Sequence, residues 1–192
     1  PKTIIEEIAK HTKDDTVVAT DVGQHQMWTT QFYDFTKPRT FLTSGGLGTM
    51  GFGLGAAIGA SIGLDKKTTV LITGDGSFSM NLNELSTAVN QKLPIKIFII
   101  NNGALGMVKQ WQSIFYDNHF SQTLLPQNPD FSMIAKGYGA SGFTVTTKDE
   151  LVNTLDEVFK TDNVCVVDIK ISTDENVLPM IPPNGSILDI IM

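Results

Sequence analysis

The pattern of apolar and polar residues predicts alternating strands and helices. Two runs, 68–73 and 95–100, are short, continuous and apolar, and turn-forming residues follow each of them. Such runs are typical of strands buried on both faces of a parallel sheet. Further predicted strands occupy 16–20, 143–146 and 164–171. The chain is therefore expected to form an α/β domain with a parallel sheet, helices on both faces and a site along the carboxyl edge.

Three segments with helical spacing begin with a capping-box pattern, in which a small polar residue is followed by Glu three positions later. They are Thr3-Ile4-Ile5-Glu6, Asn81-Leu82-Asn83-Glu84 and Thr147-Lys148-Asp149-Glu150. The second is expected to bury Leu82, Leu85 and Val89 and to end before Pro94. A further apolar stripe predicts a helix at 131–138. Residues 1–171 are interpreted as one domain, and the proline-containing segment 172–192 as a tail that forms a lid.

The segment 41–64 carries no charge and has glycines at every fourth position from Gly51 to Gly63. A membrane helix with a small-residue face is one interpretation, but eight glycines between 45 and 63 make the segment only weakly apolar. A dinucleotide fingerprint at 46–51 is another interpretation. It is disfavoured because no acidic residue ends the next strand at the distance that such a fingerprint requires. The remaining interpretation is a helix whose glycine stripe packs closely on a neighbour.

Candidate chemistry lies where the two central strands end. Asp75 follows the first strand and Asn102 follows the second, so both are expected at the same edge of the sheet. A carboxylate and an amide oxygen suit a hard cation such as Mg²⁺, which keeps open positions for phosphate oxygens. Gly74 and Gly76 remove side chains where a diphosphate approaches the backbone. A hairpin turn at Asp75-Gly76 is disfavoured because the residues that follow have helical spacing.

These residues carry a resemblance to a known family. Gly-Asp-Gly at 74–76, followed after 24 residues by Asn-Asn at 101–102, resembles the thiamine diphosphate motif of thiamine-dependent enzymes. The segments 23–28, 48–53, 106–111 and 177–182 resemble the catalytic subunit of acetohydroxyacid synthase, also called acetolactate synthase. The similarity extends over nearly the whole chain and corresponds to the carboxyl-terminal, diphosphate-binding domain of that subunit.

The resemblance implies a set of site residues for thiamine diphosphate and Mg²⁺. The expected cofactor contacts are Gly23, Gln24, His25, Gly48, Met50, Gly74, Asp75, Gly76, Ser77, Asn102, Ala104, Gly106 and Met107. The expected metal ligands are Asp75, Asn102 and the carbonyl of Ala104, and the expected substrate channel is formed by Met107, Val108 and Trp111. Considered without the resemblance, His25 is a structural histidine at a helix start, Met50 is a core residue, and Trp111 belongs to a core helix.

The resemblance also implies an activity and partners. In that family the cofactor decarboxylates pyruvate and joins the two-carbon unit to pyruvate or 2-ketobutyrate in branched-chain amino-acid biosynthesis. A glutamate from another subunit activates the cofactor, and a separate domain binds FAD. No glutamate of this chain occupies a matching motif. The chain is thus expected to be an inactive fragment of a homodimer or larger homo-oligomer, with a regulatory subunit as a further candidate partner.

Two other functions stay open at this point. One is another thiamine diphosphate-dependent decarboxylase or oxidase that acts on 2-keto acids. The other is a non-enzymatic, metal-dependent nucleotide-binding module.

Composition narrows the class of partner. The chain has 192 residues, 41% of them hydrophobic, and a net charge of -6. That length suits one sizeable core. The acidic balance, without a run of Lys or Arg, argues against nucleic acid and anionic membranes. The single cysteine, Cys165, lies in an apolar run and is expected to be an unreactive core thiol, which fits a reducing, cytoplasmic location.

Overall fold

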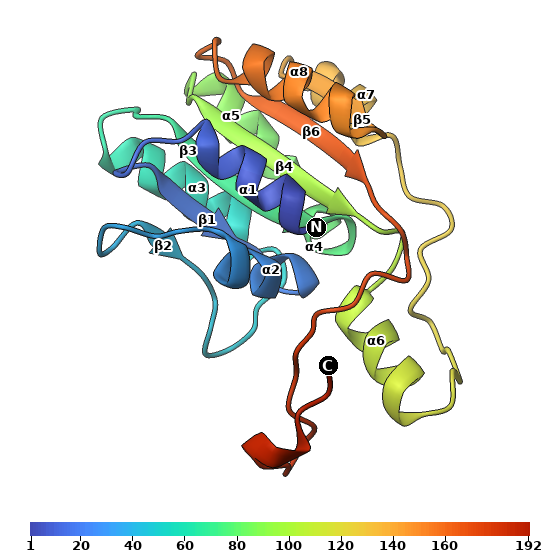
Figure 1. The fold of residues 1–192 in the computed structure, drawn as a ribbon. Helices are drawn as coiled ribbons and strands as arrows, with labels where there is room; N and C mark the ends of the chain where they lie inside the picture. The colour runs from blue at the N-terminus through green and yellow to red at the C-terminus, as the bar shows by residue number, and fades with distance from the viewer.

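A computed structural model describes all 192 residues, and its centre is a six-stranded parallel sheet (Figure 1). The strand order is β2-β1-β3-β4-β6-β5, and every neighbouring pair is parallel. The strands are β1 (Val17–Thr20), β2 (Phe41–Leu42), β3 (Thr69–Gly74), β4 (Ile95–Asn101), β5 (Ser141–Val145) and β6 (Cys165–Lys170). The predicted α/β class, with its parallel sheet, is confirmed.

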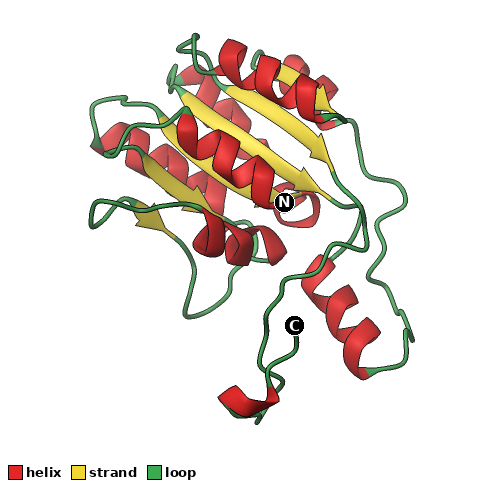
Figure 2. Cartoon of the chain, in the orientation of Figure 1, coloured by secondary structure: helices red, strands yellow, loops and turns green.

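Helices cover both faces of this sheet (Figure 2). One face is covered by α1 (Lys2–Lys10), α2 (Gln24–Phe32) and α8 (Lys148–Val158). The other is covered by α3 (Phe52–Gly63), α4 (Asp75–Ser79), α5 (Leu85–Asn90) and α7 (Phe131–Gly137). The helix α6 (Gly106–Phe115) and the tail, with the short 3₁₀ helix η2 (Ile187–Asp189), lie beyond the carboxyl edge of the sheet.

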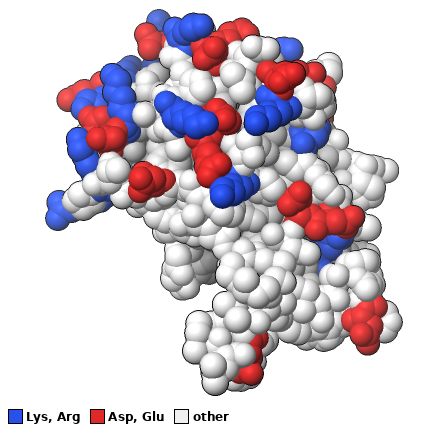
Figure 3. Space-filling model, viewed as in Figure 1, with Lys and Arg blue, Asp and Glu red and all other residues white.

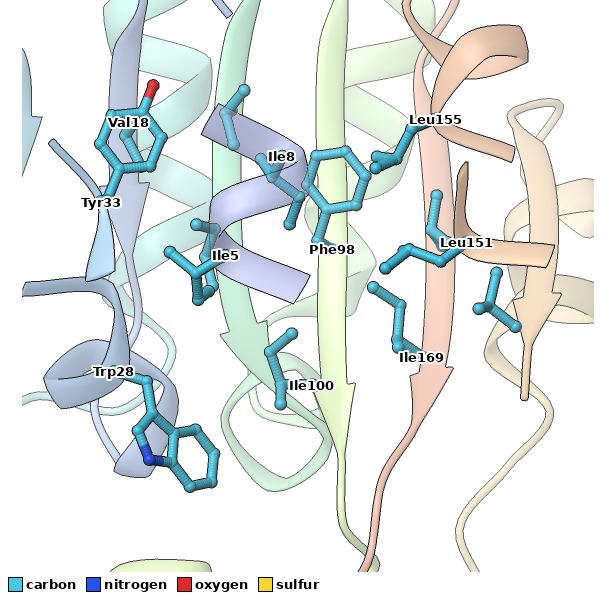
Figure 4. Close-up of a cluster of buried hydrophobic side chains, with 14 of the residues drawn as sticks. Ile5, Ile8, Val18, Trp28, Tyr33, Phe98, Ile100, Leu151, Leu155 and Ile169 are labelled. Carbon is cyan, nitrogen blue, oxygen red and sulfur yellow. The ribbon is translucent and has the colours of Figure 1, made fainter. Parts of the chain in front are cut away.

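Alternate residues of the central strands supply two separate cores. Phe98 of β4 contacts the cluster that includes Ile5 and Ile8 of α1 and Leu155 of α8 (Figure 4). Its neighbour Ile97 points to the opposite cluster. Both β3 and β4 are buried along their whole length. Burying each large apolar side chain contributes about 1.5–3 kcal/mol, so the two-sided core explains why these runs are continuous rather than alternating.

The strand order places a crevice between β1 and β3. The chain leaves β1 for the outer strand β2 and then returns to β3 on the other side of β1. At such a switch point the loops after the two strands turn away from each other, which opens a space at the carboxyl ends. The segment that follows β1 begins at Asp21, and α4 begins at Asp75 directly after β3.

Of the three predicted capping boxes, only the one at Thr147 is confirmed. The prediction at Thr3 is wrong because α1 begins at Lys2, so Thr3 lies inside the helix. The prediction at Asn81 is also wrong. The Asn81 amide donates to the Gly51 carbonyl instead (3.2 Å). The chain there forms the 3₁₀ helix η1 (Leu82–Glu84), and α5 begins only at Leu85.

The predicted close packing of the glycine stripe on α3 is wrong within this chain. A Cβ atom added at Gly55, Gly59 or Gly63 meets no atom within 4 Å. The close approach is at Gly53, one residue into the helix, where an added Cβ would lie 2.6 Å from Leu71 Cδ1 and 2.8 Å from Asp21 Oδ2. No helix of the structure has both the length and the apolar character needed to cross a membrane.

These contacts predict opposite effects for two glycine substitutions in α3. Gly53→Ala should lower the free energy of unfolding by about 1–3 kcal/mol, because the added methyl group overpacks a filled site. Gly55→Ala, in open space on the same helix, should raise it by about 0.5–1 kcal/mol. Urea unfolding of the two variants measures both effects. Equal stability of the two variants would contradict the packing described for α3.

Candidate functional site

A cavity of about 180 Å³ lies at the carboxyl ends of β1, β3 and β4. Its lining includes every residue expected to contact the cofactor except Gly48, which is exposed on the loop before α3. The end of β3, the starts of α2, α4 and α6, and the loops next to them therefore bring the predicted residues together. The cavity is smaller than the roughly 300–1,000 Å³ of typical ligand pockets, so it encloses one part of a ligand rather than a whole cofactor.

Asp75, the first residue of α4, places a buried carboxylate in this cavity. It is 1% exposed, and burial raises its pKa, while a hydrogen bond from Asn128 Nδ2 to Asp75 Oδ2 opposes that shift. The Asn128 amide also donates to Asn101 Oδ1 (3.3 Å). No group of three His, Cys, Asp or Glu residues is placed to hold a metal. A cation here would therefore be held by one carboxylate together with neutral oxygens.

Asn102 and Ala104 supply the neutral oxygens on the neighbouring loop. Both residues are buried and line the cavity. The Asn102 Nδ2 donates to Gln24 Oε1 (2.9 Å), and its Oδ1 accepts from the Ala104 amide (3.1 Å). Ser77 also lines the cavity, but its hydroxyl donates to the Val22 carbonyl (2.8 Å) and thus joins α4 to the loop after β1.

His25, in the first turn of α2, has the one buried side-chain polar atom without a hydrogen-bond partner, Nε2. Its ring is 5% exposed and lines the cavity. Burial lowers the pKa of His25 from 6.5 to about 3, so the imidazole is neutral at pH 7. An unpaired buried polar atom is costly and uncommon, and it is explained when a ligand supplies the partner.

The glycines of this cavity also leave space for neighbouring side chains, and their predicted contact with a diphosphate stays a prediction. A Cβ atom at Gly23 would lie 2.9 Å from His25 Cε1, and one at Gly74 would lie 2.8 Å from His25 Nδ1. Gly23 also has a φ of 148°, which an L side chain rarely adopts. These two glycines make room for the imidazole. At Gly76 the added atom would meet the Leu105 side chain, 2.8 Å away.

Asp21, which was not predicted as a site residue, holds the Met50 loop in place. Its Oδ1 accepts from the amides of Gly51 (2.7 Å) and Gly53 (3.2 Å), and its Oδ2 accepts from Thr73 Oγ1 (3.0 Å). Burial raises the pKa of this carboxyl group, and the backbone bonds oppose that shift. The carboxylate thus caps the start of α3 and joins it to β3.

Two further polar residues were missed. Asp168 is buried on β6, where it accepts from Asn101 Nδ2 (2.8 Å) and pairs with Lys170 (2.7 Å). Gln110 is the buried residue of α6. A charge inside the apolar run 164–171 was the available signal for Asp168, because an interior strand tolerates a charge only with partners. No sequence signal distinguishes Gln110 from the other glutamines.

The expected channel residues divide into two groups. Met107 lines the cavity, whereas Val108 and Trp111 lie outside it on α6. The prediction that Trp111 belongs to a core is wrong: it is 38% exposed and makes an edge contact with Phe115. The reason is that α6 lies beyond the edge of the sheet, where its apolar side has little of this chain to pack on.

Few cationic side chains lie near α6 and the tail on the face drawn in Figure 3. On the face drawn in Figure 3, Lys and Arg gather mainly over the part remote from α6 and the tail. A bound phosphate group would therefore depend on local donors and a metal ion rather than on a basic surface.

Comparisons with known proteins agree with this geometry. A family described as thiamine pyrophosphate enzyme, C-terminal TPP binding domain, matches residues 21–169. Among solved structures, the benzoylformate decarboxylase of Polynucleobacter necessarius aligns with a TM-score of 0.83 and 25% identity, over 93% of this chain and 34% of that one.

Three similar curated proteins carry the name acetolactate synthase. The chain is 45% identical to the acetolactate synthase isozyme 2 large subunit of Escherichia coli K12, over 95% of this chain and 33% of that protein. It is 44% identical to the acetolactate synthase large subunit of Haemophilus influenzae, over 100% of this chain and 34% of that protein. It is 43% identical to the chloroplastic acetolactate synthase 1 of Zea mays, over 100% of this chain and 31% of that protein. The chain thus spans about a third of the length of these relatives.

The neutral state of His25 predicts a pH dependence of stability. Between pH 7.5 and 5.5 the unfolded histidine, with a pKa of 6.5, takes up a proton that the folded one, with a pKa of about 3, does not. Stability therefore falls as the pH falls, and this residue accounts for about 1.4 kcal/mol of the loss. Urea unfolding at the two pH values should show that the free energy of unfolding falls by that amount less in His25→Gln than in the wild type. The control His119→Gln, at an exposed loop position, should keep the parental loss. An equal loss in wild type and His25→Gln would contradict a neutral buried imidazole.

Proposed function

Because the chain belongs to the family of C-terminal thiamine pyrophosphate-binding domains, we propose that its cavity holds Mg²⁺ and the diphosphate part of thiamine diphosphate. The observation that carries this proposal is the convergence, at the switch point of the sheet, of one buried carboxylate with the unpaired Nε2 of His25. The donor set fits such a group, since it combines a single charged oxygen with neutral oxygens and one open ring nitrogen.

Each residue has a separate task in this proposal. Asp75, Asn102 and the Ala104 carbonyl would ligate the metal ion, while Gln24 and His25 would lie against the diphosphate. Met50, held by the loop that Asp21 caps, would contact the thiamine rings together with Gly48. Thiamine diphosphate supplies the nucleophile and the electron sink of the reaction. The residues of this chain supply position, and their burial excludes water from the phosphate end.

We infer that the complete protein is an acetolactate synthase. The large subunits of that name match this chain over nearly its whole length. The activity would be decarboxylation of pyruvate and transfer of the two-carbon unit to a second 2-keto acid. The activating glutamate, an FAD site, a homo-oligomeric assembly and a regulatory subunit would all come from outside these 192 residues. The division at 171/172, the role of the tail as a lid and a cytoplasmic location stay predictions.

Another thiamine-dependent 2-keto acid enzyme is the second candidate. The structural similarity to benzoylformate decarboxylase favours it, because a shared fold at 25% identity accommodates either reaction. Substitution of Trp111 in the complete protein would distinguish the two candidates, because a channel residue of an acetolactate synthase would act on the choice of the second 2-keto acid.

The metal role of Asp75 is tested by Asp75→Ala. This residue would be the only charged ligand, so the variant should lose Mg²⁺-dependent binding of thiamine diphosphate by about 100-fold or more while it stays folded. Isothermal calorimetry with thiamine diphosphate and with ADP, each with and without Mg²⁺, measures the loss. The matched control is Asp34→Ala, at an exposed loop carboxylate. Unchanged cofactor affinity in folded Asp75→Ala, or tighter binding of ADP by the wild type, would refute the proposal.

The channel role of Trp111 is tested in the complete protein by the ratio of acetohydroxybutyrate to acetolactate formed from mixed substrates. The two acceptors differ by one methylene, which an apolar contact discriminates by about 1–3 kcal/mol. Trp111→Leu should erode the preference for 2-ketobutyrate at little cost in melting temperature. Trp28→Leu, at the buried tryptophan (3% exposed), should instead lower stability by several kcal/mol, of the order of 3. A lower melting temperature with an unaltered ratio in Trp111→Leu would exclude the channel role.

A further inference from the structure

The side chain of Gln110 uses every hydrogen-bonding position that an amide has. It is 2% exposed and is the buried residue of α6. Its Oε1 accepts from Gln24 Nε2 (2.9 Å) and from the Val177 amide (2.8 Å). Its Nε2 donates to the Val177 carbonyl (2.9 Å) and contacts Met180 Sδ (3.4 Å). A neutral amide with two acceptor and two donor positions is therefore fully satisfied away from water.

Val177 determines which way round this amide lies. The residue is in the C-terminal tail, and its side chain is fully buried in the hydrophobic cluster on the sheet face that α1, α2 and α8 cover. Its backbone N–H is always a donor and its carbonyl always an acceptor. The oxygen of Gln110 must therefore face the Val177 amide, and the nitrogen must face the carbonyl.

The orientation of the Gln110 amide determines that of Gln24, which contacts Asn102 at the candidate metal site. Because Gln110 presents an oxygen, Gln24 must turn its NH₂ group toward it, and that group also donates to the Glu175 carbonyl (2.9 Å). The Oε1 of Gln24 then faces Asn102, which has to present its own NH₂ group (2.9 Å). The Asn102 oxygen is thereby left on the other side, where it accepts from the Ala104 amide (3.1 Å).

Close packing keeps the three amides in register. A Cβ atom at Gly106 would lie 2.0 Å from Gln24 Oε1 and 2.6 Å from Asn102 Nδ2, so the helix start presses on this contact. The tail makes a second contact, from Thr173 Oγ1 to the Asn102 carbonyl (2.9 Å). The row Val177, Gln110, Gln24 and Asn102 thus joins the tail to the cavity without a charged group.

We propose that Gln110 is a positioning residue. The Val177 backbone fixes the orientation of the Gln110 amide, which fixes that of Gln24 and, through it, that of Asn102, so that the Asn102 oxygen faces the metal. This inference rests on the proposed function, because it assigns Asn102 as a ligand. Binding of the tail at Val177 and affinity for Mg²⁺ are then coupled. A ligand amide whose outer partner is lost rotates more freely and presents nitrogen in place of oxygen in part of the population.

The test compares Gln110→Met with Gln110→Glu in the complete polypeptide that carries this sequence. Mg²⁺ is titrated at saturating thiamine diphosphate to give its apparent dissociation constant, and hydrogen exchange of residues 173–180 reports tail binding. Gln110→Met removes every polar contact, so it should weaken Mg²⁺ binding by about 10-fold or more and increase exchange in the tail. Gln110→Glu keeps an oxygen toward Gln24 but cannot donate to Val177. It should increase exchange in the tail while Mg²⁺ affinity falls less than in Gln110→Met.

Gln112→Met is the matched control on the same helix. Gln112 accepts from Ser121 N (3.3 Å) and Thr123 Oγ1 (3.0 Å) and makes no contact with Gln24 or Val177. The Gln112→Met variant should change the apparent dissociation constant for Mg²⁺ by no more than about two-fold, because substitutions away from a site usually have small effects. Circular dichroism verifies that each variant is folded.

Two results would overturn the inference. One is an unchanged Mg²⁺ constant in folded Gln110→Met, whatever the tail does. The other is a greater loss in Gln110→Glu than in Gln110→Met, which is the result expected if the residue were only structural and a buried charge were the main damage. Both leave the proposed function intact when the wild type binds Mg²⁺ and thiamine diphosphate. Absence of that binding in the wild type refutes the proposed function itself.

Discussion

The burial of both faces of the sheet is the constraint on which the rest of the structure depends. Helices cover both faces of β3 and β4, so the few polar side chains of these two strands lie near the strand ends, including the carboxyl edge of the sheet. At that edge the switch between β1 and β3 opens the space that their loops line. The site is therefore a consequence of the strand order. Its chemistry comes from a few residues after each strand, chiefly Asp21, Asp75 and Asn102.

Shared hydrogen bonds, rather than ion pairs, position the groups of this site. Asp21 uses its carboxylate on backbone amides of the Met50 loop, and Asn102 is held by the amide of Gln24. A side-chain amide donates from its nitrogen and accepts at its oxygen, so the orientation of one amide determines the orientation of the amide that it bonds. Charged partners would lack that property. A second carboxylate would also compete for a metal ion with Asp75, the one carboxylate that lines the cavity.

The position of α6 beyond the sheet explains both the exposure of Trp111 and the burial of Gln110. The polar side of α6 contacts the tail, so Val108 and Trp111 are left exposed while Gln110 is enclosed. A helix arranged in this way is suited to present a surface to a substrate or to another part of a larger protein. That arrangement is the structural basis for the channel role proposed for Trp111.

The pattern of the sequence by itself determined the fold class, the five longer strands and the shared edge of Asp75 and Asn102, while the family resemblance supplied most of the other residues that meet in the cavity. It did so because a strand buried on both faces needs a continuous apolar run, and because Asp75 and Asn102 end two such runs. Only the tertiary structure decided the role of Asp21, the true close approach at Gly53, and the row of amides from Val177 to Asn102. The hydrogen bonds of Asp21 and of this row join residues 30 to 86 positions apart. Local spacing carries no information about such contacts, since they form only when separate elements pack at one edge of the sheet.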